Sequence, residues 1–195
     1  MKQHQIERMH QSICEAKQAI ELAHALVSPS PVALISKFKG MNAAKTFLEI
    51  VYGSARFKAI VQLHAVLDPD TKNISIHALR KGLRPISKTL DDPIEQEREA
   101  QIKEIDRILR DHANTIKGVA RLRHQQLSHI SSSEDPELTY ENAHLTHEKL
   151  KGLLEDLNIF STRVIRSINS CVPVFKTGEK ALVDAFTALE KSVEK

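Results

Sequence analysis

The sequence is poor in glycine, tryptophan and aromatic residues, and each shortage excludes a class of protein. Its 195 residues include only six glycines, and no two are spaced to form the glycine-rich loop of P-loop or dinucleotide-binding enzymes. Tryptophan is absent and aromatic residues make up 4% of the chain. That composition disfavours a β-sandwich and a stacking platform for single-stranded nucleic acid.

Cysteine and long apolar runs are scarce as well. The two cysteines, Cys14 and Cys171, form no C-x-x-C pair, so we expect reduced thiols. The polar start Met1–Gln5 lacks the apolar core of a signal peptide, and no apolar run is long enough to cross a membrane. We therefore expect a cytoplasmic protein without a membrane partner.

What remains is a pattern of amphipathic helices with short breaks. Apolar residues recur at steps of three and four, without the alternation of strands. The predicted helices cover 2–27, 42–67, 75–88, 93–123 and beyond, 140–169 and 178–193. We predict an all-α bundle of five to seven helices in a single domain, residues 1–195.

Three local signals refine this prediction. Gly53 lies within the most apolar helix, which we expect to be central and buried, and the glycine would let another helix approach closely. Ser75 or Asn73 is the predicted cap of the helix that follows, and Pro93 suits a first helical position. The helix from Pro93 is predicted to run about thirty residues without a break, with an apolar stripe that Arg123 interrupts.

Positive charge is concentrated in the second quarter of the chain, although the net charge is only +3. The segment 71–90 has no acidic residue. It is either a solvated basic face or a contact surface for phosphates. The candidate RNA-binding residues are Lys72, Arg80, Lys81, Arg84 and Lys88, with Arg121 at the basic end of the following helix.

Arg123, His124 and His129 form the sharpest cluster, among ten histidines in all. Basic residues near the C-terminus of a helix can simply stabilise its dipole. They also combine a permanent cation with groups that transfer protons near neutral pH. On an unbroken helix, Arg123 and His129 would be separated by about 600° of rotation and about 9 Å of rise. They can act together only if the helix bends or a second copy of the chain contributes.

This cluster resembles the R-x(4–6)-H signature of the HEPN superfamily, with five residues between Arg123 and His129. The apolar helix ending in Leu67-Asp68-Pro69 and the Ser75-led helix resemble the abortive-infection, AbiU-like branch. Leu127-Ser128-His129 and Leu138-Thr139-Tyr140 resemble later segments of that branch. The resemblance covers residues 5–170, so the terminal helix, 178–195, lies outside it.

The resemblance implies a HEPN-like bundle that acts as a metal-independent endoribonuclease without a cofactor. It implies a homodimer whose two motifs face one cleft, a toxin or abortive-infection role, and possible pairing with an antitoxin protein. Arg123 and His129 would be catalytic, with His124 auxiliary. Two alternatives stay open: an inactive HEPN module that binds RNA or a partner protein, and a purely structural helical dimer.

The other histidines have simpler interpretations. His144 and His147 are three residues apart on a predicted helix, but no H-E-x-x-H motif or nearby cysteine supports them, so we predict no metal site. His64 and His77 lie in apolar surroundings and are interpreted as packed side chains. His10 is interpreted as a helix-surface or partly buried residue, together with His4, His24 and His112.

Overall fold

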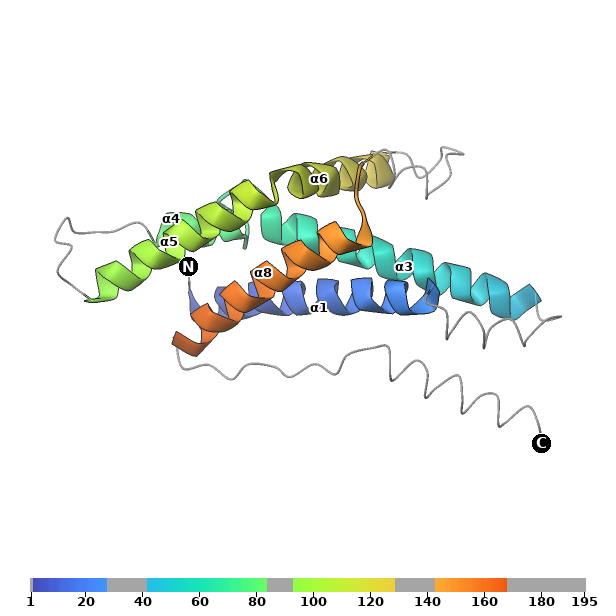
Figure 1. Ribbon diagram of the computed structural model, residues 1–195, viewed down its shortest axis with the longest axis horizontal. Coiled ribbons are helices and arrows are strands. Elements are labelled where there is room, and N and C mark those ends of the chain that lie inside the picture. Colours follow the sequence, from blue (N-terminus) through green and yellow to red (C-terminus); the bar gives the residue numbers. More distant parts are fainter. Residues whose placement is uncertain (1, 28–41, 84–92, 129–142, 168–195) are drawn as a thin grey trace, which may run out of the picture.

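The protein is an all-α bundle, as predicted. The computed structural model describes residues 2–27, 42–83, 93–128 and 143–167 (the backbone alone at 42–45 and 125–128), and these ranges contain six helices and no strand (Figure 1). The helices are α1 (Gln3–Val27), α3 (Asn42–Leu67), α4 (Ile76–Gly82), α5 (Pro93–Asp111), α6 (Ala113–Ser128) and α8 (His147–Ser167). The predicted terminal helix lies outside the described residues.

Helix α1 lies along α3 and is crossed by α8, and these three helices enclose most of the core (Figure 1). Its apolar residues occur every three or four positions, so one face meets both neighbours, with Met9 and Ile13 fully buried. Leu63 of α3 and Phe160 of α8 reach the same core. Burial of each such side chain stabilises the fold by about 1.5–3 kcal/mol.

Among the described side chains of α3, the buried ones lie in the second half of the helix, which corrects the prediction of a largely buried helix. Ile60 and Leu63 are inaccessible to solvent, whereas Phe47 and Ile50 are 63% and 61% exposed. The expected close approach at Gly53 is also wrong, because a Cβ atom there would meet nothing within 4 Å. The later turns of α3 therefore pack into the core and lead into the loop before α4.

The helix predicted to run unbroken from Pro93 past Arg123 is divided at His112 into α5 and α6. The backbone N–H of His112 still donates to the carbonyl of Ile108 at 3.1 Å, and that of Ile116 to the carbonyl of His112 at 2.9 Å. Because these helical hydrogen bonds continue, α5 and α6 meet at a bend rather than at a loop (Figure 1).

The buried face of this bent pair is not the predicted stripe. In α6 the buried side chains are those of Thr115, Val119 and Leu122. Arg123 follows Leu122 and is exposed. The arginine therefore lies beside the buried face and does not interrupt it.

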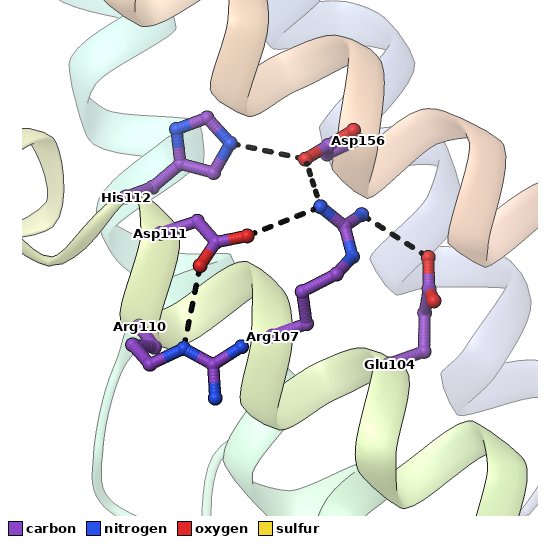
Figure 2. Close-up of polar contacts among 6 residues, drawn as sticks. All are labelled: Glu104, Arg107, Arg110, Asp111, His112 and Asp156. Carbon is purple, nitrogen blue, oxygen red and sulfur yellow. Dashed lines mark hydrogen bonds and ion pairs between the residues drawn. The ribbon is translucent and has the colours of Figure 1, made fainter.

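A charged cluster fastens the bend to α8 (Figure 2). The Asp156 carboxylate of α8 accepts hydrogen bonds from His112 Nε2 at 3.1 Å and from Arg107 Nη1 at 3.2 Å. Arg107 also pairs with Glu104 and Asp111 of its own helix. Burial raises the pKa of Asp156, but the hydrogen bonds from His112 and Arg107 outweigh burial and hold it below its usual value.

The close approach that a glycine allows occurs at Gly118 of α6. A Cβ atom there would lie 2.7 Å from the carbonyl oxygen of Ala143 and 2.9 Å from Leu145. The segment before α8 therefore rests directly on the α6 backbone.

The structure tests two further predictions, about where α4 and α8 begin. Ser75 caps α4, because its Oγ accepts a hydrogen bond from the N–H of Ala78 at 3.3 Å, as predicted. The helix predicted from Tyr140 begins only at His147, since residues 143–146 are not helical. Thr146 Oγ1 accepts from the N–H of Lys149 at 3.3 Å and marks that start.

His10 is a buried core residue, which corrects its interpretation as a surface or partly buried residue. It is 1% exposed, and its Nδ1 lies 2.8 Å from the Oγ atom of Ser161 on α8. Its Nε2 lies 3.4 Å from the Sγ atom of Cys14. Burial lowers the pKa of His10, so the ring is neutral at pH 7.

Candidate functional site

A groove of about 630 Å³ opens between α1, α3, α6 and the loop that joins α3 to α4. That volume lies within the usual range for small-ligand sites. Its polar lining residues are Arg8 and Ser12 of α1, His64 of α3, Asp68, Lys72 and Asn73 of the loop, and Arg123 of α6.

One face of α3 forms a wall of the groove. Phe57, Val61 and His64 line it, and Asp68 follows directly after the helix. Their spacings of three and four residues place them on one side of α3. The neighbouring side, with Ile60 and Leu63, is buried in the core. The groove is thus lined by residues adjacent to the hydrophobic seam of the bundle.

The carboxylate of Asp68 shapes the loop after α3. Its Oδ1 accepts the N–H of Asp70 at 2.8 Å, and its Oδ2 accepts Asn73 Nδ2 at 2.9 Å. Asp70 Oδ1 in turn accepts the N–H of Lys72 at 2.9 Å. These bonds hold the pKa of Asp68 below its ordinary value, first through the Asp70 N–H. The folded loop brings Lys72 to the groove.

The groove is positively charged. Arg8, Lys72 and Arg123 are exposed cations from three different segments, and Asp68 is the one acidic residue among the described lining residues. No salt bridge joins these three cations to any other described side chain. Such a groove favours a ligand with negative charge, such as a phosphate or a carboxylate, which arginine can bind through two parallel hydrogen bonds.

His64 lies in this groove, which corrects its interpretation as a packed core residue. Its side chain is partly buried, and it forms no hydrogen bond with a described residue. Burial lowers the pKa of His64, Arg123 lowers it further, and Asp68 opposes both. Its imidazole is therefore neutral at pH 7, and neither ring nitrogen is hydrogen-bonded to a described residue.

Arg123 and His124 both lie on α6, and both side chains are exposed. Arg123 lines the groove, whereas His124 is not among the lining residues. His129 lies outside the described residues. Arg123 is five residues before the last residue of α6, so the helix dipole does not explain it, because that effect is confined to the last turn.

The predicted basic residues that the structure describes have different surroundings. Lys72 lies in the groove, but Arg80 pairs with Asp106 of α5, and Lys81 Nζ donates to Thr71 Oγ1 at 3.3 Å. Arg121 is exposed on α6, two residues before Arg123 and so on another side of the helix. Arg84 and Lys88 lie outside the described residues.

Sequence reasoning missed three groove residues: Arg8, His64 and Asp68. The spacing of Phe57, Val61, His64 and Asp68 was a usable signal, since it defines one helical face that ends in a carboxylate. No sequence signal linked Arg8 to Arg123, because only the packing of α1 and α6 around α3 brings them to one groove.

The histidines considered for a metal site do not gather. His147 stacks on His24 of α1, with ring centroids 4.0 Å apart, and His144 is exposed. Across the described ranges, no three histidine, cysteine, aspartate or glutamate side chains are grouped so that they could hold a metal ion. None of the described helices is long and apolar enough to cross a membrane.

Comparison with known proteins identifies a family. No curated protein and no solved structure is detectably similar to the chain. The family model described as AbiU2, of the HEPN group, matches residues 5–188, which is most of the chain and includes every helix lining the groove. The protein therefore belongs to the HEPN AbiU2 family.

Proposed function

We propose that the protein is a metal-independent endoribonuclease of the HEPN type that acts as a toxin or abortive-infection effector. Arg123 and His129 are its catalytic residues, and His124 supports them. The observation that carries this proposal is the position of Arg123, exposed in a cationic groove of a HEPN AbiU2 family member. A toxic ribonuclease of this kind would also have an antitoxin protein as a partner.

The chemistry suits these residue types. Cleavage of RNA by its own 2′-hydroxyl needs a base, an acid for the departing 5′-oxygen, and a cation for the negative charge on phosphorus. Arg123 supplies the cation and can bind two phosphate oxygens at once. Lys72 lies at the same groove and would hold the neighbouring phosphate. His129 supplies proton transfer.

The active form is proposed to be a homodimer. Phe47, Ile50, Phe57 and Val61 are between 38% and 63% exposed and form an apolar stripe along α3. The stripe is continuous with the groove, since Phe57 and Val61 belong to both. A two-fold axis beside Val61 would bury the stripe and place two Arg123 side chains along one cleft.

The test is cleavage of single-stranded RNA by purified protein in EDTA. Arg123→Ala and His129→Ala are each expected to lower the rate by about 10²-fold or more, and His124→Ala by less. Arg163→Ala, on the exposed surface of α8, is the matched control and should keep the wild-type rate. Wild-type rates in both the Arg123 and His129 variants would refute the proposal.

The alternative is an inactive HEPN module that binds RNA or a partner protein. RNA binding that weakens steeply with salt, without cleavage, would favour this alternative. The absence of any RNA binding would instead leave the exposed stripe on α3 as the main functional surface and favour a structural dimer or a protein partner.

A further inference from the structure

We propose that His64 is the general base of the site: it accepts the 2′-hydroxyl proton of the RNA bound in the groove beside Arg123. The inference rests on the proposed ribonuclease function and adds a residue from α3, about sixty positions before the arginine in the chain.

The geometry carries this assignment. His64 and Arg123 project from different helices and line the same groove. A phosphate held by Arg123 would therefore lie in the groove that the His64 side chain also lines. Among the described histidines, His64 is the one that lines the groove. Its ring forms no hydrogen bond with another described residue.

The charges around His64 suit a base. Arg123 of α6, Arg8 of α1 and Lys72 of the loop line the same groove as His64, while Asp68, directly after its own helix, is the one acid among the described residues of the groove. Burial and Arg123 hold the pKa of His64 below its usual value. The ring therefore enters the reaction without a proton, as a base must.

The step balances as an internal transesterification. The 2′-oxygen forms a bond to phosphorus as His64 removes its proton, and the bond from phosphorus to the 5′-oxygen breaks. The departing 5′-oxygen takes a proton from the acid of the proposed function. The products are a 2′,3′-cyclic phosphate and a 5′-hydroxyl, and Arg123 balances the charge on the phosphoryl oxygens.

The chain offers a matched control in His77 of α4. Both histidines are partly buried, and burial lowers the pKa of each. Asp68 raises the pKa of both. His77, however, does not line the groove. His64→Gln and His77→Gln thus remove similar rings, only one of which meets the substrate.

The first experiment measures kcat/KM for single-stranded RNA against pH in EDTA. His64→Gln is expected to lower kcat/KM by about 10²-fold and to remove the acidic limb that the wild type shows below pH 6.5. His77→Gln should keep the wild-type kcat/KM and the acidic limb of its pH profile. The binding of a 2′-O-methyl RNA, which cannot be cleaved, should differ less than about two-fold between His64→Gln and wild type. Circular dichroism and thermal melting check that both variants fold.

The second experiment separates a base from an acid. A uridine 3′-(4-nitrophenyl phosphate) substrate has a leaving group that needs no proton. If His64 is the base, His64→Gln stays about 10²-fold slower than wild type on this substrate. Recovery of the wild-type rate would assign His64 as the acid and overturn the inference. His64→Ala should regain activity when imidazole is added, whereas His77→Ala should show no response.

The outcomes distinguish this inference from the function beneath it. RNA cleavage by the wild type with an unchanged rate and pH profile in His64→Gln overturns only the role of His64. No cleavage by the wild type overturns both. A large loss of 2′-O-methyl RNA binding in His64→Gln would make the histidine a binding residue and overturn its role as base.

Discussion

The guanidinium of Arg80 donates two parallel hydrogen bonds to the carboxylate of Asp106, from Nε at 2.6 Å and from Nη2 at 3.0 Å. The bidentate pair joins α4 to α5 and raises the pKa of Arg80 while lowering that of Asp106. Arg80 is among the candidate RNA-binding residues of the sequence, and its guanidinium is engaged by Asp106. Lys72, eight residues earlier, instead lies at the groove.

We therefore expect Arg80→Gln and Lys72→Gln to have different effects. Arg80→Gln should lower the free energy of unfolding by less than about 1 kcal/mol, because the pair is partly exposed, and should change RNA affinity little. Lys72→Gln should weaken RNA binding and reduce the salt dependence of log K by about 0.7. Fluorescence anisotropy at several salt concentrations measures both. Equal losses of affinity would contradict the assignment.

Two glycines in helices should respond in opposite directions to alanine. Gly118→Ala would press its Cβ against the Ala143 carbonyl and Leu145, so it should lower the free energy of unfolding by about 1–3 kcal/mol. Gly53→Ala meets open space and should raise it by about 0.5–1 kcal/mol. Urea denaturation of both variants measures these changes in unfolding free energy. A Gly118→Ala variant that is more stable than wild type would disprove the close contact.

His10 should make the fold sensitive to mild acid. Its pKa in the folded state is below 6.5, so the unfolded chain binds the proton more readily. The stabilising contribution is present above pH 6.5 and is lost as the pH falls through the folded pKa, by up to about 1.4 kcal/mol per pH unit. His10→Gln should show a flatter decline in unfolding free energy between pH 7 and pH 5. His4→Gln, on an exposed residue, is the control and should keep the wild-type slope.

Asp156 should contribute more to the free energy of unfolding than Asp111 of the same cluster. Asp156→Asn weakens the bonds from Arg107 and His112 and should lower the free energy of unfolding by about 1–2 kcal/mol at pH 7. Asp111→Asn contacts the same Arg107 from a more exposed position and should cost less than about 0.5 kcal/mol. Because the folded pKa of Asp156 is depressed, its contribution is present above about pH 4 and lost below it. Thermal melts at pH 7 and pH 3 test both points.

The helices were predictable because each carries its own apolar repeat, and local periodicity is enough to place α1, α3 and α4. The bend at His112 could not be predicted from the sequence, because both flanking segments are helical and their hydrogen bonds continue across it. At the bend, His112 and Arg107 contact Asp156 of a helix that is distant in the sequence. The buried face already runs through Ile108 before the bend and continues through Val119 and Leu122 after it.

The candidate site was predictable only in part for the same reason. Arg123 could be identified from a local motif and lies in the groove, although His129 lies outside the described residues. His64 is flanked by Leu63, Ala65 and Val66 and therefore looked like a packed residue. The groove depends on how α1, α3 and α6 pack, and single-segment patterns contain no information about that.

The bend at His112 sets the direction in which α6 continues from α5, and the Asp156 cluster joins that bend to α8 (Figure 2). Arg123 is eleven residues from His112, which is about 16 Å at the rise of an α-helix. A change of about 4° in the angle between α5 and α6 would move the arginine by about 1 Å. A displacement of that size can change a catalytic rate about 10²-fold. Under the proposed function, Asp156 would therefore help to position Arg123 without itself lining the groove.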